Sequence, residues 1–388
     1  MPVVRINAVL VVLPLLAVAS LYGFPFLKTA PNRLMSGLPV YFSALPQGMA
    51  WLSAALLLVL VAIAFLKPSH AALSVAAIAS ALLVPALLWL AASQAVLLAH
   101  TQSPIARTSL GGGFWLASLS GALMAADALR RLQAGRAARL LVLAAVAVPV
   151  ALMLWAGSCD ELALMKEYAS RADVFWPTVL RHLQIVGASL LLAVCMGLPL
   201  GWAAWRFERV GTSLFPVLNI VQTIPSIALF GLLMAPLALL AAGWPALAKA
   251  GVGGVGLAPG VIALLLYSLL PIVRGMLTGL SQVPSSVVEA ATGLGMRPAG
   301  IFWRVQLPLA LPVILAGVRT AAVQAVGLAA VTALIGAGGL GAIMFEGLYA
   351  NAQDLVLLGV LPMVLMGVLV DMAFSGLMSW LRGSATHD

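Results

Sequence analysis

The chain has 388 residues, of which 63% are hydrophobic and only 8% are charged. Its mean hydropathy of +1.13 excludes an ordinary soluble protein, because no soluble core needs so many apolar runs of about 20 residues. The formal net charge of +9 would suggest nucleic-acid binding in a soluble chain. In a membrane protein it is better explained by basic loops that set orientation, so we expect no nucleic-acid partner.

Ten apolar runs are each long enough, or nearly so, to cross about 30 Å of hydrocarbon as a helix. The sequence therefore predicts an all-α polytopic membrane protein with about ten transmembrane helices in the lipid bilayer. We interpret the first run as an uncleaved span, because it is long for a signal peptide and more spans follow. The runs lie at 8–26, 48–66, 72–98, 110–129, 140–157, 183–204, 213–235, 257–273, 309–335 and 355–381.

Basic residues in short loops predict the orientation of these spans. With ten spans, most of the arginine-bearing loops fall on one face, which we assign to the cytoplasm together with both termini. Four basic residues fall on the other face and weaken this assignment: Lys28, Arg33, Arg107 and Lys249. Asp127 closes a span beside arginines and predicts an interfacial ion pair. The arginines that carry the assignment are Arg130, Arg131, Arg136, Arg139, Arg206, Arg209, Arg297, Arg304 and Arg382.

The spans divide the chain into two parts. Residues 1–157 hold five spans without a recognisable motif, and residues 179–388 hold five more. Between them, 158–178 is predicted to be a linker on the outer, periplasmic side. It holds four acidic residues, Asp160, Glu161, Glu167 and Asp173. Two cysteines, Cys159 and Cys195, form neither a disulfide framework nor a metal-binding pattern.

A polar stretch at 286–308 interrupts the apolar second part. Ser286 followed by Glu289 is a capping-box pattern, which predicts a short helix that starts near Val287. Glycines then end that helix, since glycine tolerates the left-handed turn after a helix. Pro298 is placed to start a second short helix. The local prediction is helix, glycine turn, helix on the cytoplasmic side.

This stretch resembles the EAA loop of ABC importer permeases. The match keeps the complete spacing of that motif and is long and specific, unlike a lone glycine pair. The resemblance implies a coupling helix that docks into a cleft of a cytoplasmic ATPase. The alternative is an ordinary amphipathic surface loop. The matching residues are Glu289, Ala290, Ala291, Gly295, Val305, Leu307 and Pro308.

The resemblance extends over nearly all of 175–381. The segments 221–233, 264–280, 307–323 and 334–341 are similar to permeases for osmoprotectants, meaning glycine betaine, choline and related quaternary amines. It implies a C-terminal five-helix permease core with the EAA loop between its third and fourth helices, in a long form with an extra N-terminal membrane region. It also implies the bacterial inner membrane as location and several partners: an ATPase dimer, a second permease chain, the same or different, and a periplasmic substrate-binding protein.

The chain carries no ATP-binding motif of its own. A P-loop needs Gly-Lys-[Ser/Thr], and none of the lysines Lys28, Lys67, Lys166 and Lys249 follows a glycine. We therefore expect a transport protein that is not an enzyme, without cofactor or metal, whose ATP is bound by the partner. Two glycine clusters, at 251–256 and 336–341, lack the strand that a dinucleotide fingerprint requires. In the second cluster, a tight re-entry turn or a lining of the exit path is expected for Gly336, Gly338, Gly339 and Gly341.

Two charges lie inside apolar runs, where charges are costly and usually functional. Arg319 and Asp371 should each lie about 15 Å from the cytoplasmic edge. We predict that they face each other as an ion pair, which either locks the last two helices together or takes part in gating or lining the path. His182 and Gln184 open a span at the outer face, as a solvated helix end or as path-lining groups.

The function predicted from the sequence is the permease subunit of a binding-protein-dependent ABC importer for glycine betaine, choline or a related solute. A permease of the same fold for methionine or another small solute is the first alternative. An ion-coupled secondary transporter is the second, but it would need membrane carboxylates, and the chain offers mainly Asp371. A membrane scaffold or sensor is the third, to which 1–157 alone could belong.

Overall fold

The computed structural model of the chain describes residues 8–32, 35, 37–66, 69–101, 105–249 and 251–384. Arg33 and Lys67, which were used above for orientation and for the ATP-site argument, lie outside the described residues. The chain forms two compact units, an N-terminal unit at Met1–Ser170 and a C-terminal unit at Arg171–Asp388. Each is described by itself below.

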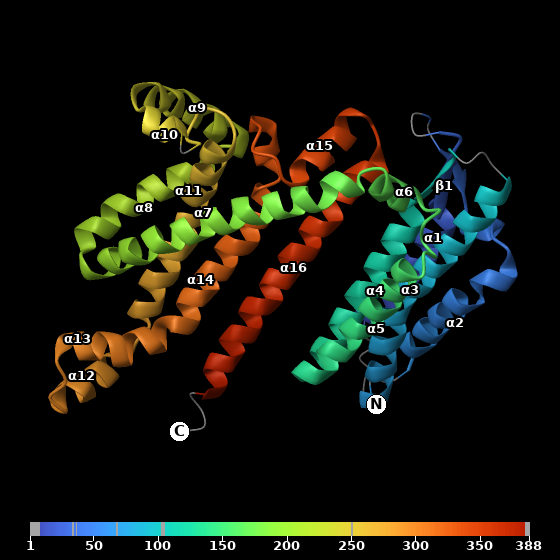
Figure 1. Cartoon of the computed structure of the whole chain (residues 1–388). Coiled ribbons are helices and arrows are strands. Elements are labelled where there is room, and N and C mark those ends of the chain that lie inside the picture. Colours follow the sequence, from blue (N-terminus) through green and yellow to red (C-terminus); the bar gives the residue numbers. More distant parts are fainter. Residues whose placement is uncertain are drawn as a thin grey trace. The chain divides into compact units, whose positions relative to one another are not determined.

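The N-terminal unit is built from six α-helices and a small sheet (Figure 1) among the residues that the structure describes. The sheet has the order β2-β1-β3, and β1 pairs antiparallel with both neighbours. The sequence did not predict it, because strands of three or four residues are too short to show an alternating pattern. The elements are α1 (Ala8–Gly23), β1 (Leu27–Ala30), β2 (Leu38–Val40), the 3₁₀ turn η1 (Phe42–Ala44), α2 (Gln47–Ala64), α3 (His70–Thr101), β3 (Arg107–Leu110), α4 (Gly112–Arg131), α5 (Arg136–Trp155) and α6 (Ala163–Ala169).

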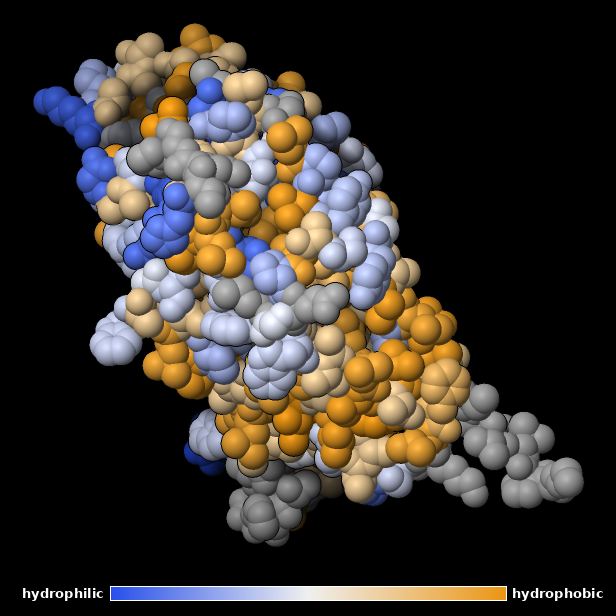
Figure 2. Space-filling view, turned by 90° about the vertical axis from the view of Figure 1, so that its right-hand side faces the viewer, coloured by the Kyte–Doolittle hydropathy of each residue, from blue (hydrophilic) through white to orange (hydrophobic). Residues whose placement is uncertain are grey.

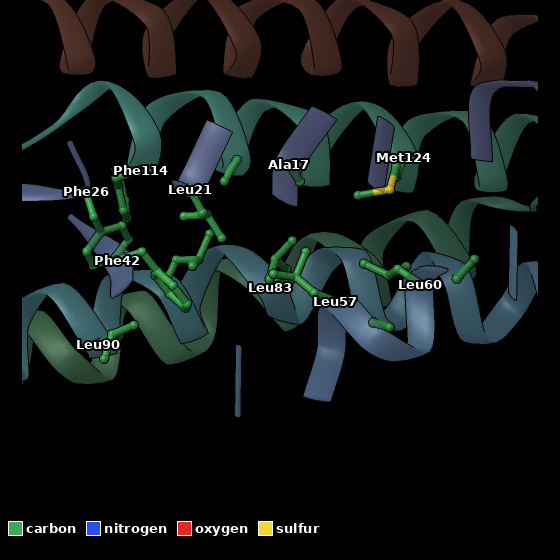
Figure 3. Close-up of a cluster of buried hydrophobic side chains, with 14 of the residues drawn as sticks. Ala17, Leu21, Phe26, Phe42, Leu57, Leu60, Leu83, Leu90, Phe114 and Met124 are labelled. Atoms are coloured by element: carbon green, nitrogen blue, oxygen red, sulfur yellow. The ribbon is translucent and has the colours of Figure 1, made fainter. Parts of the chain in front are cut away.

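The core of this unit lies between α1, α2, α3 and α4. Leu21, Leu83 and Leu90 are almost completely buried there, at alanine-rich faces that let the helices approach closely (Figure 3). Phe26 closes the sheet end of the core, with its ring 5.7 Å from Phe42 and 6.2 Å from Phe114 in edge-to-face geometry.

Helix α5 differs from its neighbours because it buries none of its residues within the unit. Its exposed side chains are large and apolar, among them Leu140, Leu141, Leu152 and Trp155. Figure 2 shows apolar side chains over a wide area of the molecular surface. Such a surface is stable in lipid and not in water, because hydrocarbon solvates these side chains.

The C-terminal unit is arranged around α11. Helix α11 packs against both α7 and α14, and its Leu264 and Ile272 are fully buried. The elements are α7 (Ala172–Arg206), α8 (Glu208–Thr223), α9 (Ser226–Gly243), α10 (Pro245–Lys249), α11 (Leu257–Ser281), α12 (Ser285–Gly293), α13 (Pro298–Ile301), the π-helical turn η2 (Phe302–Gln306), α14 (Leu307–Leu328), the 3₁₀ turn η3 (Val331–Ile335), α15 (Leu340–Tyr349) and α16 (Gln353–Ser384).

The predicted class, a helical polytopic membrane protein, is confirmed, with a smaller number of full-length spans. Within the described residues, eight helices are long and apolar enough to cross a membrane. The expected spans at 8–26 and 48–66 form the shorter helices α1 and α2. Five of the eight lie in the C-terminal unit, and α12 lies between the third and fourth of them, as the resemblance implied.

Two boundaries in the C-terminal unit differ from the prediction. Helix α7 begins at Ala172, well before the expected start at residue 183, and runs for 35 residues. The run predicted at 213–235 is broken between α8 and α9, because Pro225 forces the residue before it out of helical geometry. Ile224 accordingly has extended backbone angles, φ −70° and ψ 127°.

The predicted linker is largely helical, since it contains α6 and the first turns of α7. Its first half packs within the N-terminal unit: Lys166 pairs with Glu161 at 2.7 Å and donates to the Ala106 carbonyl. Burial, and then the charge of Asp160, raise the pKa of the Cys159 thiol, so this thiol stays protonated at neutral pH. The interfacial pair predicted at Asp127 is confirmed, because Arg130 and Arg131 bind its two carboxylate oxygens at 2.9 and 2.7 Å.

Candidate functional site

The EAA stretch folds as a helical hairpin made of α12 and α13 at the end of α14 (Figure 1). Helix α12 ends in a Schellman turn, in which the Met296 amide donates to the Ala291 carbonyl and the Gly295 amide to the Thr292 carbonyl. Gly295 has a φ of +76°, the left-handed conformation that this turn requires. The predicted glycine turn is therefore formed at Gly295.

The predicted capping box is wrong. Helix α12 begins at Ser285, and its N-cap is Pro284, which makes no side-chain capping bond. Ser286 is consequently the second helical residue and cannot adopt the extended backbone of an N-cap. The prediction failed because it placed the helix start two residues too late, and Pro284, with its φ of −61°, leads directly into the helix.

The hairpin exposes most of the EAA residues. Glu289 and Ala290 are exposed, whereas Ala291 is buried, with 6% of its surface exposed. Leu294, which the sequence did not single out, is 84% exposed at the tip of the hairpin. A large apolar side chain at such a position is typical of a residue that becomes buried in a partner.

The hairpin is joined to the membrane helices without a break. Pro298 starts α13, and the chain then continues through η2 into α14. Phe302 and Leu307 pack against Met276 and Ile314, which belong to α11 and α14. The segment that follows the hairpin is therefore packed against both α11 and α14. Of the remaining motif residues, Val305 is half-buried and Pro308 is exposed near the start of α14.

The two intramembrane charges lie together in the structure. Arg319 of α14 donates from Nε to the Asp371 Oδ1 atom at 2.6 Å, and its Nη2 lies 2.5 Å from the same oxygen. Asp371 belongs to α16, which packs along α14. The contact joins the fourth and fifth spanning helices of the unit.

The second glycine cluster forms a tight turn between η3 and α15. Gly336, Gly338 and Gly339 all have positive φ angles. A side chain at Gly341 has no room, because its Cβ atom would lie 1.9 Å from the Ala330 carbonyl oxygen. The Arg181 side chain of α7 also donates to the Ala337 carbonyl at 3.0 Å, so the turn is fixed to the first spanning helix of the unit.

His182 is a correction to the sequence analysis. It is not at a solvated helix end, because α7 starts ten residues earlier and His182 is fully buried. Its Nε2 atom lies 3.1 Å from the Val326 carbonyl oxygen, and the turn at Gly339 packs against its ring. The residue therefore joins α7 to α14 and to the glycine turn.

One polar residue was missed from the sequence. Arg274 lies inside α11, because this helix continues to Ser281, past the expected end of the span at residue 273. Its signal is visible in the sequence: it interrupts an apolar run that contains Pro271 and Val273 before it and Met276 and Leu277 after it. No group of three or more histidine, cysteine or acidic side chains that could hold a metal occurs among the described residues.

Comparison with known proteins identifies both parts of the chain. Residues 193–383 match the model of the binding-protein-dependent transport system inner membrane component, and residues 5–165 match the N-terminal domain of the ABC transporter permease YehY. The osmoprotectant import permease OsmW of Salmonella typhimurium is 37% identical over 195 residues, which cover 49% of this chain and 84% of the relative.

Two further matches are a sequence relative and a solved structure. The glycine betaine/carnitine/choline transport system permease OpuCD of Bacillus subtilis is 37% identical over 203 residues, which cover 52% of this chain and 80% of the relative. The inward-facing MetNI methionine ABC transporter overlaps with a TM-score of 0.46 at 22% identity, over 55% of this chain and 98% of that one.

A helical chain with several membrane spans that matches the importer permease model over its C-terminal part belongs to the class of transport permeases, which are not enzymes. The chain belongs to the inner-membrane permeases of binding-protein-dependent ABC importers, in the form that carries a YehY-type N-terminal domain. A permease of this kind works with an ATPase and with a substrate-binding protein.

Proposed function

We propose that the chain translocates a compatible solute of the glycine betaine or choline type into the cell. The support for this substrate class is the 33–37% identity to permeases named for osmoprotectants, glycine betaine, carnitine and choline. A binding protein delivers the solute at the outer face, and two permease chains form the pathway. A permease for methionine or another small solute remains the alternative, and only the partner binding protein separates the two.

The coupling step is the centre of this proposal, and the α12–α13 hairpin carries it. Its exposed tip at Leu294 docks into the cytoplasmic ATPase dimer, with Glu289 and Ala290 on the same short helix. The Schellman turn at Gly295 fixes the angle between the two arms. Packing of Phe302 and Leu307 on α11 and α14 then converts closure of the ATPase pair into movement of the spanning helices.

Other parts of the chain take supporting roles in the proposal. The Arg319–Asp371 pair locks α14 to α16, and the glycine turn at 336–341 holds the outer end of the pathway. Both termini face the cytoplasm. Residues 1–157 form a membrane extension, 158–178 a periplasmic connection, and 179–388 the permease core in the bacterial inner membrane.

The test is uptake of labelled glycine betaine into vesicles that hold this chain with its co-expressed permease, ATPase and binding-protein partners. We expect ATP-dependent uptake. ATP hydrolysis stimulated by the binding protein without betaine uptake would show that the substrate is a different solute, and it would support the coupling role. Uptake driven by an ion gradient, with no ATPase present, would overturn the proposal.

A further inference from the structure

A polar groove lies in the C-terminal unit between α8, α11 and α14, and the coupling role proposed above does not use it. The groove has a volume of about 430 Å³. Its polar lining consists of Gln222, Arg274, Thr278, Thr320 and Gln324. These side chains come from three different helices, so the groove is a feature of the packed unit rather than of one helix.

The groove lies at membrane depth. Arg274 is seven residues before the end of α11, which places it about 10 Å inside the helix end. An arginine at this depth is costly in hydrocarbon, so its charged group faces protein, a water-filled path or, by extending its side chain, the membrane interface. The neighbouring hydroxyl and amide groups of Thr320 and Gln324 favour the same orientation. We therefore assign this side of α11 and α14 to an aqueous path or an interface.

The charge of Arg274 is oriented but not neutralised. Its Nη2 atom donates to the Asn219 Oδ1 atom at 2.8 Å, which fixes the guanidinium group with a neutral partner. Within the described residues, no carboxylate lies within ion-pair distance of Arg274. Arg319, by contrast, has its carboxylate in Asp371.

The C-terminal unit of a second copy of this chain would not supply the missing negative charge. The acidic residues of the C-terminal unit lie near helix ends or in the hairpin, in α15 and at the chain end, with one exception inside a spanning helix, Asp371. Asp371 already binds Arg319. The counter-charge of Arg274 then comes from outside this unit: from another protein segment, from ions in the path or from the transported solute.

The groove is bounded where α11 and α14 cross by two glycines, Gly275 and Gly317. A Cβ atom at Gly317 would lie 2.5 Å from the Pro271 carbonyl oxygen and 3.0 Å from the Gly275 Cα atom. The α11 and α14 backbones therefore touch directly, as small residues allow in membrane helices. No side chain projects from these positions into the groove, and a small solute has room beside Arg274.

We propose that Arg274 binds the carboxylate of the transported solute in this groove, so that the pathway favours betaines, which carry a carboxylate, over choline, which carries none. A guanidinium group matches a carboxylate through two parallel N–H donors, and Asn219 occupies only one of its nitrogens. The inference rests on the proposed function for the solute class. It adds that the Arg274 guanidinium group lets the permease itself select among those solutes.

The first test compares two solutes that share the trimethylammonium group. Uptake of labelled glycine betaine and of labelled choline is measured in the reconstituted complex with Arg274→Gln, Arg274→Lys and the control Arg209→Gln, which removes a charge outside the groove. We expect Arg274→Gln to lower betaine uptake roughly tenfold or more, because a hydrogen bond between charged groups is lost, and choline uptake less than about twofold. Equal losses for both solutes, or no loss, would overturn the inference.

The second test does not depend on the substrate. In a chain with Cys159 and Cys195 replaced by serine, Thr320→Cys places one thiol in the groove. We compare its reaction with a sulfonate-bearing and an ammonium-bearing methanethiosulfonate. The sulfonate reagent should react several-fold faster while Arg274 is present, and Arg274→Gln should abolish the difference, because the fixed positive charge concentrates anions.

Together, the two tests distinguish a failure of the groove inference from a failure of the proposed substrate class. Equal reagent rates with Arg274 in place, or a thiol that does not react, would overturn the inference whatever the uptake shows. A preserved preference for the sulfonate reagent, with neither solute taken up by the wild type, would remove the proposed substrate class and retain an anion-selective groove.

Discussion

The two glycine turns of the C-terminal unit use the same residue for different physical reasons. At Gly295 an added Cβ atom would meet no atom within 4 Å, and only the φ of +76° calls for glycine. At Gly341 the φ angle is ordinary, but the space is filled by the backbone of Ala330. The first turn is defined by conformation at an open surface, and the second by packing.

This difference separates a structural role from a coupling role. Where neighbouring backbone leaves no room for a side chain, replacing the glycine disturbs the fold itself. Replacing a glycine at an open turn changes the shape and chemistry of the surface while the core stays intact. Variants of the two turns should therefore fail in different assays, and the predictions below follow from the largest effect to the smallest.

Gly341→Ala should have the largest effect. Its methyl group would lie 1.9 Å from the Ala330 carbonyl oxygen, so α15 must move away from η3. We expect a loss of about 1–3 kcal/mol or more of stability, and with it most of the folded protein. The measurement is the fraction of detergent-extracted chain that stays monodisperse after stepwise heating.

Gly338→Ala is the matched control in the same turn. Its Cβ atom would lie 3.5 Å from the Arg181 Cγ atom, an ordinary contact, so the cost comes only from its φ of +82°. That conformational cost is about 1–2 kcal/mol for an L-residue. If Gly341→Ala proved as heat-stable as the wild type, the assignment of this turn to packing would be wrong.

Gly295→Asp should leave the fold intact and impair transport. Aspartate tolerates left-handed geometry better than most residues, and no atom opposes its side chain. We expect near-normal insertion and heat stability, together with uptake lowered roughly tenfold and ATP hydrolysis no longer linked to it, because the charge and the altered turn weaken docking by about 1.4 kcal/mol. Uptake and ATP hydrolysis are measured in the same vesicles.

Gly293→Asp is the control for the charge alone. It lies two residues away on the same exposed hairpin, at a negative φ and with open space around it. Normal uptake in Gly293→Asp beside a failure of Gly295→Asp would assign the effect to the turn. Normal uptake in Gly295→Asp would contradict the coupling role of the hairpin.

The sequence predicts these two turns unequally, for a physical reason. The turn at Gly295 follows from a local pattern, since a Schellman turn involves only neighbouring residues. The contact of Gly341 with Ala330, and of Gly339 with His182, depends on how η3, α7 and α15 pack, which no local pattern contains.

The same reason explains other successes and failures. The spans at α3, α11 and α16 were found because length and apolarity are local. The partnership of Arg319 and Asp371 was predictable because two rare intramembrane charges at equal depth have few alternatives. The small sheet of the N-terminal unit, the burial of His182 and the groove around Arg274 were missed, because each arises from segments distant in sequence.

The Arg319–Asp371 pair should have an intermediate effect. Arg319→Gln or Asp371→Asn alone leaves one charge without its partner at membrane depth, whereas the double change removes both charges. We expect each single variant to lose more heat stability than the double variant does, which gives a clear coupling in the double-mutant cycle. Additive losses would show that the contact contributes nothing to holding α14 on α16.

Ser286→Ala should have the smallest effect, and it distinguishes the hairpin observed from the hairpin that the sequence pattern suggested. A true N-cap serine contributes about 1 kcal/mol, but Ser286 is the second residue of α12 and caps nothing. We expect heat stability and ATP-driven uptake within error of the wild type. A loss comparable to that of a missing cap in Ser286→Ala, reproduced by Glu289→Ala and absent from Ser286→Thr, would mean that Ser286 is the N-cap and that the helix starts at Val287.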